Sequence, residues 1–318
     1  MAQVKGRFAP TPSGKLHLGN VFSALLAWLS VRAQGGQMLL RIEDLDLART
    51  SPAFTAAIID DLAWLGLTWQ EGPGREKGHA PYLQSRRTPF YEAQLAKLRA
   101  LGLIYPCFCS RAELHAAEAP HLADGSYVYS GKCRALSFEE QARRAAAHPG
   151  ATRVRVPNLA IGFTDGCQGP YEENLQQACG DFILRRSDGV FAYQLAAPAD
   201  DGEMEVTEVV RGLDLLSSAP RQIWLMQTLG YPPPQYRHVP LLLAPDGRRL
   251  SKRDKDMDLA ALRSRCQTPE PLLGFLACTA GLLPEPTPIS AEGLVPFFSW
   301  AKVKKENIVL QPGFERYF

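Results

Sequence analysis

The sequence of 318 residues predicts an α/β protein built on a Rossmann-type parallel sheet, with an insertion and a short C-terminal helical region. Two short apolar segments, Val4–Ala9 and Met38–Ile42, have the character of buried parallel strands. Each is followed by a segment in which apolar residues recur with helical spacing. Strands that alternate with amphipathic helices are typical of parallel α/β folds.

The first helix is expected at Val21–Ala33, and Gly35 is placed to end it. A second amphipathic helix is expected at Pro52–Leu65. From Gly72 to His79 the chain becomes polar and glycine-rich, which we interpret as a boundary before a long helix at Arg86–Leu103.

The remaining elements are predicted from the same two periodicities. They are a solvated helix at Ser137–His148, a strand at Thr152–Val156, a hairpin at Asp181–Tyr193, core strands at Glu205–Val210 and Val239–Leu243, and helices at Leu259–Cys266, Pro271–Leu282 and Ala291–Ala301. This order divides the chain into the first half of the α/β domain at 1–83, an insertion at 84–190, the second half of the domain at 191–255 and a helical region at 256–318.

The turn after the first strand is the first candidate site. It runs from Arg7 to Asn20 and contains His17 and Gly19. A turn that leads directly into a helix N-terminus presents free N–H groups and a positive dipole to phosphate. His17 adds a hydrogen-bond donor that can follow the phosphates into a charged transition state. For this segment alone, a simple turn histidine is the better interpretation.

A second basic motif comes late in the chain, where Arg249, Leu250, Ser251, Lys252 and Arg253 follow a turn. Lysine is a compact charge that suits phosphates, although a solvated loop would be the better interpretation of this segment in isolation. In this order and separation, the two motifs resemble the HIGH and KMSKS signatures of class I aminoacyl-tRNA synthetases.

Charged side chains are also expected where core strands end, which is where ligands bind in open α/β sheets. Glu43 follows the second strand and can meet an ammonium group or a ribose. Arg211 follows the third strand and can hold a carboxylate in a bidentate manner. A helix-capping cluster is the alternative for Glu43, and a salt bridge to Asp214 or Glu208 is an equal alternative for Arg211.

Three cysteines of the insertion, Cys107, Cys109 and Cys133, suggest a tetrahedral zinc site. Free buried thiols remain an equal alternative, because neither the spacing nor the fourth ligand is standard. A closed site of this kind has a structural role. The candidates for the fourth ligand are Tyr129, His115 and His121.

The composition excludes some classes of protein. The net charge of +2 gives no global field for nucleic acid, so any RNA contact must use local basic patches. No stretch reaches the length of a membrane span, and no export signal is present. Seven unevenly spread cysteines argue against a disulfide framework. We therefore expect a cytoplasmic protein that does not bind membranes.

Six segments together resemble glutamyl-tRNA synthetases: Arg7–Asn20, Arg41–Asp46, Tyr105–Ser110, Asp181–Leu195, Val209–Gln222 and Leu241–Arg253. The resemblance covers Lys5 to about Asp254. Full members of that family carry a large anticodon-binding region after the lysine loop, and only 65 residues follow Arg253 here. The chain therefore looks like the truncated paralogues that glutamylate queuosine in tRNA(Asp).

This resemblance implies activation of L-glutamate by ATP and Mg²⁺ without tRNA, followed by transfer to the cyclopentenediol of queuosine at the wobble position of the tRNA(Asp) anticodon. It implies glutamate-binding positions at Arg7, Ala9, Thr11, Glu43, Tyr193 and Arg211. It implies ATP-binding positions at Pro12, His17, Gly19, Asn20, Ser251 and Lys252, with His17 and Lys252 as the catalytic pair. It implies one structural Zn²⁺ bound by Cys107, Cys109, Tyr129 and Cys133, and we expect a monomer.

Three other functions remain as alternatives. A truncated synthetase of this kind can charge the 3′ end of a conventional tRNA with glutamate. A nucleotidyltransferase that joins ATP to a metabolite shares the histidine–glycine motif and a lysine loop. An inactive RNA-binding paralogue is disfavoured because Arg7, Glu43, Arg211 and Lys252 occur together.

Overall fold

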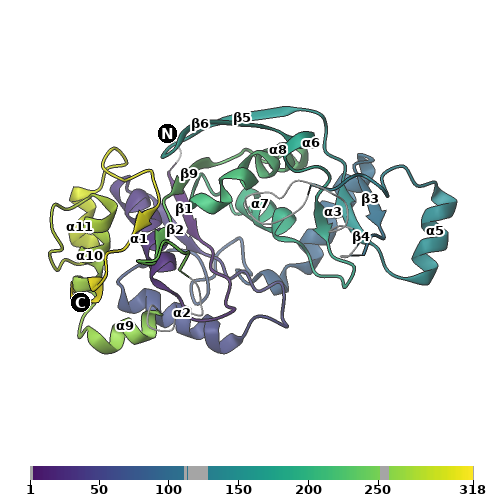
Figure 1. Ribbon diagram of the computed structural model, residues 1–318. Helices are drawn as coiled ribbons and strands as arrows, with labels where there is room; N and C mark the ends of the chain where they lie inside the picture. Colours follow the sequence, from purple (N-terminus) through teal and green to yellow (C-terminus); the bar gives the residue numbers. More distant parts are fainter. Residues whose placement is uncertain (1–2, 111–112, 114–127, 251–257, 318) are drawn as a thin grey trace.

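A parallel four-stranded sheet of order β2-β1-β8-β9 lies at the centre of the protein, as the sequence predicts (Figure 1). The computed structural model describes residues 3–110, 113, 128–250 and 258–317. The sheet strands are β1 (Lys5–Phe8), β2 (Gln37–Leu40), β8 (Glu208–Gly212) and β9 (Gln235–Val239). Because β1 and β8 are neighbours although they are far apart in sequence, their carboxyl ends form one edge from two parts of the chain.

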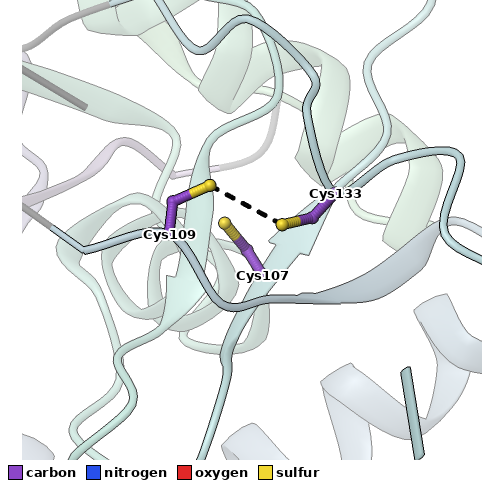
Figure 2. Close-up of side chains that lie close together, drawn as sticks. All are labelled: Cys107, Cys109 and Cys133. Atoms are coloured by element: carbon purple, nitrogen blue, oxygen red, sulfur yellow. Dashed lines mark hydrogen bonds between the residues drawn. The ribbon is translucent and has the colours of Figure 1, made fainter. Parts of the chain in front are cut away.

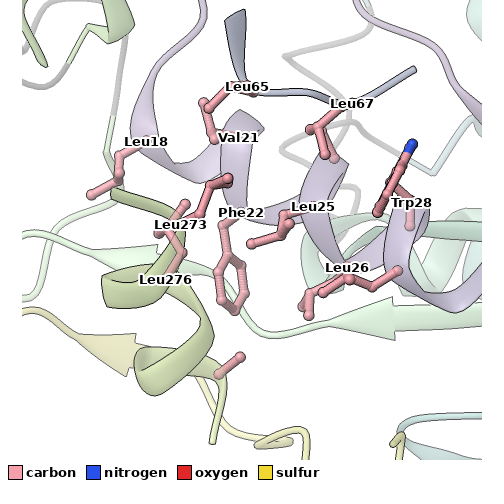
Figure 3. Packing of buried hydrophobic residues seen from close by; sticks show 14 of the residues in the cluster. Leu18, Val21, Phe22, Leu25, Leu26, Trp28, Leu65, Leu67, Leu273 and Leu276 are labelled. Atoms are coloured by element: carbon pink, nitrogen blue, oxygen red, sulfur yellow. The ribbon is translucent and has the colours of Figure 1, made fainter. Parts of the chain in front are cut away.

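Helix α1 (Leu18–Ala33) connects β1 to β2 and is buried on more than its sheet-facing side. The predicted apolar stripe is confirmed, with Phe22, Leu25, Leu26 and Leu29 at most 1% exposed. The C-terminal helix α10 (Glu270–Ala280) belongs to the same apolar cluster (Figure 3). The C-terminal region is therefore part of the core that holds α1 against the sheet.

Close packing of α1 on β1 depends on Gly6. A Cβ atom at this position would collide with the side chain of Val31 on α1. The absence of a side chain lets the helix approach the strand closely. This approach fixes where the helix N-terminus lies relative to the end of β1.

The insertion between β2 and β8 contains two smaller antiparallel sheets. One has the order β3-β4-β7, and the other is the hairpin β5–β6. In Figure 1, β3, β4 and helix α5 lie at the opposite end of the molecule from α10 and α11. The elements of the insertion are α3 (Thr88–Ala100), β3 (Ile104–Cys107), α5 (Phe138–Ala147), β4 (Ala151–Val154), β5 (Ala160–Asp165), β6 (Gly169–Asn174), α6 (Leu175–Ala178) and β7 (Ile183–Arg185).

The remaining elements complete the protein around the central sheet, and β10 and α11 contact α1. They are α2 (Pro52–Trp64), α7 (Tyr193–Glu203), α8 (Ala219–Leu229), β10 (Leu242–Leu243), α9 (Leu259–Arg265), α11 (Ala291–Leu294) and β11 (Ile308–Val309), with 3₁₀ turns at Gln84–Arg86, Leu213–Ser218, Val295–Phe297 and Phe314–Tyr317. None of the helices in the described part of the chain has the length and apolar character needed to cross a membrane.

The predicted strand at Val239–Leu243 is wrong. The core strand β9 ends at Val239, and only the short β10 follows Pro240, which has no N–H group to donate to a ladder. The run of prolines at 232–234 hid the start of β9 in the sequence. The correction places His238 inside the central sheet.

Three further predicted elements differ from the structure. The third core strand begins at Glu208 rather than Glu205, because Glu205 has a φ of 57°, which is incompatible with a strand. The predicted helix at Ala291–Ala301 ends at Leu294 and continues only as a 3₁₀ turn that contains Pro296. The predicted hairpin at Asp181–Tyr193 returns as a single bridge instead of a second strand.

Candidate active site

A cavity of about 750 Å³ opens at the carboxyl ends of β1 and β8. Its wall combines the turn after β1, the segment after β2, the start of α7 and the end of β8. All the residues expected to bind glutamate line it, namely Arg7, Ala9, Thr11, Glu43, Tyr193 and Arg211. His17, Gly19 and Asn20 of the expected ATP site line the same cavity.

His17 occupies the N-cap position of α1, so it sits where the helix dipole is directed into the cavity. The side-chain oxygen of Asn20 accepts a hydrogen bond from the His17 N–H at 3.2 Å. Asn20 therefore stabilises the helix start from the position where the related signature has a second histidine. A Cβ atom at Gly19 would lie only 3.1 Å from the His17 ring, so the glycine leaves room for the imidazole.

The flanks of the second motif lie beside the first motif. Leu250 lines the cavity, and Asp258 forms an isolated β-bridge with His17. Ser251 and Lys252 fall outside the described residues. Pro12 is buried beside the cavity wall, and its carbonyl oxygen accepts a hydrogen bond from the Ser51 N–H at 3.1 Å.

Arg211 is only 5% exposed, and neutral groups accept four of its five N–H donors. Nε donates to Nε2 of His238 at 2.9 Å, and Nη1 donates to the Tyr193 hydroxyl and to the Gln222 side chain at 3.2 and 2.6 Å. Nη2 donates to the carbonyl oxygen of Leu215 at 3.2 Å. One Nη2–H and the full positive charge remain for a carboxylate.

The alternative in which Arg211 forms a salt bridge is wrong for both proposed partners. Asp214 pairs with Arg249 at 2.6 Å. Glu208 pairs with Arg237 at 3.0 Å and accepts a hydrogen bond from Ser30 at 2.5 Å.

Arg7 is held differently from Arg211. Its Nη1 donates to the carbonyl oxygen of Val210 at 3.2 Å, and its Nε lies 3.5 Å from a carboxylate oxygen of Asp201. The guanidinium is 6% exposed and its Nε makes no hydrogen bond. Arg7 is thus a buried cation with an anionic neighbour, and it retains donors that face a polar cavity.

Sequence reasoning missed the buried ion network behind Glu43. Arg41 is fully buried and contacts Glu43 at 3.2 Å, Asp201 at 2.7 Å and Asp200 at 3.6 Å. Burial raises the pKa of Glu43, although Arg41 and Arg7 act in the opposite direction. A ligand ammonium group would supply the additional positive charge that the ionised Glu43 favours. The only signal in the sequence was the position of Arg41 beside Glu43 at a strand end.

Helix α7 supplies both aspartates of this network. Burial strongly opposes ionisation of Asp201, but Arg41 and Arg7 outweigh it and lower its pKa. Asp200 accepts hydrogen bonds from Gln84 at 2.7 Å, from Arg87 at 2.8 Å and from Tyr91 at 2.8 Å. Adjacent acidic residues in a helix are usually solvated, so sequence alone gave no sign of this role.

The three cysteines of the insertion lie close together (Figure 2). None of them lines the cavity. Their sulfur atoms are all within 4.8 Å of one another. The Tyr129 hydroxyl lies 3.5 Å from the sulfur of Cys107 and 3.6 Å from that of Cys109. Burial raises the pKa of the Cys109 thiol to about 12. His115 and His121, the other candidate ligands, lie outside the described residues.

A buried arginine covers this cysteine cluster. The guanidinium of Arg153 lies 3.9 Å from the centre of the Tyr129 ring and is 6% exposed. Its Nη1 donates to the backbone carbonyl of Asp181 at 2.6 Å, while the Asp181 carboxylate is bonded by Arg134 and Tyr105. Within the described residues, Arg153 has no carboxylate partner in an ion pair.

Comparison with known proteins supports the fold. Residues 3–292 match the model of the family described as tRNA synthetases class I (E and Q), catalytic domain. The glutamyl-Q tRNA(Asp) synthetase of Symbiobacterium thermophilum is 49% identical over 95% of this chain and 94% of its own length. That of Nitratidesulfovibrio vulgaris is 45% identical over 96% of this chain and 95% of its own length.

A solved structure gives the same result for the fold. The glutamate-tRNA synthetase of Elizabethkingia anophelis superimposes with a TM-score of 0.85 at 28% identity. The superposition covers 99% of this chain and 70% of that chain. The arrangement of the central sheet and its insertion is therefore shared with a synthetase of known structure.

Proposed function

The chain belongs to the class I tRNA synthetase (E and Q) family, and we propose that it activates L-glutamate with ATP and Mg²⁺ and transfers it to queuosine in tRNA(Asp). One observation carries this proposal. The cavity combines two buried arginines and the partly buried Glu43 with a helix N-terminus of the kind that binds phosphate, in a chain that matches nearly the full length of its glutamyl-Q relatives.

Glutamate is a dicarboxylate with one ammonium group, and the cavity offers a complementary set of charges. Arg7 and Arg211 hold the two carboxylates, and Glu43 receives the ammonium group. Tyr193, whose hydroxyl already accepts from Arg211, keeps its own O–H for the substrate. Ala9 and Thr11 shape the wall of the cavity beside them.

The first step forms glutamyl-adenylate. A carboxylate oxygen of glutamate attacks the α-phosphorus of ATP, the bond from that phosphorus to the bridging oxygen breaks, and pyrophosphate leaves. His17 and Lys252 stabilise the negative charge that develops on the phosphates, and Pro12, Gly19, Asn20 and Ser251 complete the ATP site. Each such donor is worth on the order of 10²–10³ in rate.

The second step transfers glutamate to the tRNA. A hydroxyl oxygen of the queuosine cyclopentenediol attacks the carbonyl carbon of the adenylate. The new ester C–O bond forms, the bond to AMP breaks, AMP leaves and the hydroxyl proton is released. Because the nucleoside lies in the anticodon loop, the proposal places that loop at the mouth of the cavity.

The cysteine cluster has the donor set of a structural zinc site, and we assign it Cys107, Cys109, Tyr129 and Cys133 as ligands. Three thiolates and one Zn²⁺ leave a net negative charge, and the buried Arg153 offers the matching positive charge. A bound zinc would hold together this loop-rich part of the insertion. No step of the reaction passes through it.

The experiment that tests the function supplies labelled glutamate and ATP to total tRNA from cells grown with and without a source of queuosine. The proposal expects label only on tRNA that contains queuosine, and the label should survive removal of the 3′ adenosine. Labelling of both tRNA pools that is lost with the 3′ adenosine would refute transfer to queuosine.

The shared fold with a glutamate-tRNA synthetase favours one second candidate, which is charging of the 3′ end of a conventional tRNA. The same experiment separates the two functions. Absence of label from both pools would refute both candidates and would favour a nucleotidyltransferase that acts on a small metabolite.

A further inference from the structure

We propose that Asp165 and His238 are positioning residues that fix the guanidinium of Arg211 for the carboxylate of glutamate. This inference rests on the proposed function, because it assigns a task to Arg211 in glutamate binding. It concerns residues outside the cavity wall, at the point where hairpin β5–β6 meets the central sheet. Neither Asp165 nor His238 lies within a sequence motif that indicates substrate binding.

The side chains of Asp165, His238 and Arg211 form a continuous buried chain of hydrogen bonds, which we call the relay. Nδ1 of His238 lies 2.6 Å from a carboxylate oxygen of Asp165, and Nε2 lies 2.9 Å from Nε of Arg211. His238 is 0% exposed and Asp165 is 2% exposed. Asp165 is itself held by the backbone N–H groups of Cys167, Gln168 and His238.

The chemistry of the three groups determines the state of the imidazole. A guanidinium donates hydrogen bonds and never accepts them, so Nε2 of His238 must carry a lone pair. The single ring proton therefore lies on Nδ1 and is donated to the Asp165 carboxylate. Burial lowers the pKa of His238 to about 4, although the hydrogen bond to Asp165 opposes this effect, so the ring is neutral at physiological pH.

The relay determines the direction in which Arg211 points. With Nε held by His238 and Nη1 by Gln222 and Tyr193, rotation of the guanidinium plane would break several buried hydrogen bonds. The guanidinium also lies 5.0 Å from the centre of the Tyr236 ring. If the imidazole proton moved to Nε2, two N–H groups would face each other and Arg211 would lose this support.

Three substitutions test the relay by steady-state kinetics of ATP–pyrophosphate exchange. Asp165→Asn keeps the shape of the side chain but offers an amide N–H that favours the wrong tautomer. His238→Leu removes the acceptor for Arg211. His238→Gln restores an acceptor oxygen near the position of Nε2. The matched control is His79→Gln, which makes the same change at a histidine away from the cavity.

The proposal expects KM for glutamate to rise on the order of tenfold in Asp165→Asn and more in His238→Leu, while KM for ATP stays within about twofold. His238→Gln should recover most of the loss relative to His238→Leu. Nitrogen NMR of the wild-type imidazole should show the proton on Nδ1, and Asp165→Asn should shift it. If His238→Leu fails to fold, comparison of KM for glutamate between Asp165→Asn and the wild-type protein still tests whether the relay supports Arg211.

Two results would overturn the relay. One is an unchanged KM for glutamate in Asp165→Asn and in whichever His238 variants fold. The other is an equal rise in KM for glutamate and for ATP, which would indicate general damage to the site. A wild-type protein that forms no glutamyl-adenylate would instead refute the proposed function, so the two failures are distinguishable.

Discussion

Acidification should weaken the folded state through His238 in particular. The pKa of this group falls from 6.5 in the unfolded chain to about 4 in the folded protein. Because the pKa of His238 is depressed in the folded state, the contribution of its neutral imidazole to the free energy of unfolding is complete above pH 6.5 and is lost as the pH falls toward 4. At pH 5 most unfolded chains bind a proton at this site and most folded chains do not. The linkage relation then gives a loss of about 2 kcal/mol between pH 7.5 and pH 5.

Urea unfolding of the wild-type protein and of His238→Gln at both pH values measures this contribution. Other groups titrate in the same range, so the informative quantity is the difference in unfolding free energy between the two proteins. That difference should change by about 2 kcal/mol in favour of the variant at pH 5. His79→Gln serves as the control for loss of a partly exposed imidazole outside the cavity. A difference between wild type and His238→Gln that stays constant with pH would refute a depressed pKa.

Three further substitutions test the site and the cysteine cluster. Glu43→Gln should abolish glutamate activation. It should also raise the free energy of unfolding at pH 8, because burial raises the pKa of Glu43 and penalises its ionised form. This gain in stability should disappear as the pH falls below the ordinary range of a glutamate, and a lower free energy of unfolding at pH 8 would contradict the prediction. Arg153→Met should reduce the zinc that remains after dialysis, measured by metal analysis, whereas Arg155→Met should not, since Arg155 lies over Tyr105 instead. His17→Ala should slow ATP–pyrophosphate exchange on the order of 10²–10³-fold, and a loss below tenfold would contradict a role at the phosphates.

The parts of the fold that follow from local patterns were predictable from the sequence. The apolar stripe of α1 and the short apolar run of β2 appear where their periodicity placed them. Strand β9 was missed because most of its residues are polar and it follows directly on a run of prolines. Burial of that strand comes from pairing with β8 and from the hairpin β5–β6, which are long-range contacts that a local pattern does not encode.

The same division holds in the candidate site. Residues that touch the cavity could be named from motifs, because the chemistry of a ligand demands particular side chains at strand ends. The buried groups that hold these residues in place could not be named from motifs. No sequence motif marks Asp165, Asp200 or Asp201, and only the fold brings each beside the guanidinium or imidazole that it contacts.

The two cavity arginines are not equivalent, and under the proposed function this difference would determine how the site selects glutamate. Arg7 has an anionic neighbour in Asp201, so part of its charge is compensated before any ligand binds. Arg211 is surrounded by neutral acceptors in its direct contacts, so its charge remains for a carboxylate. A buried cation without an anion is costly, and the hydrogen bonds that Arg211 donates to Gln222, Tyr193 and His238 reduce that cost without neutralising the charge. A carboxylate ligand completes this arrangement, whereas an amide in its place would leave Arg211 uncompensated.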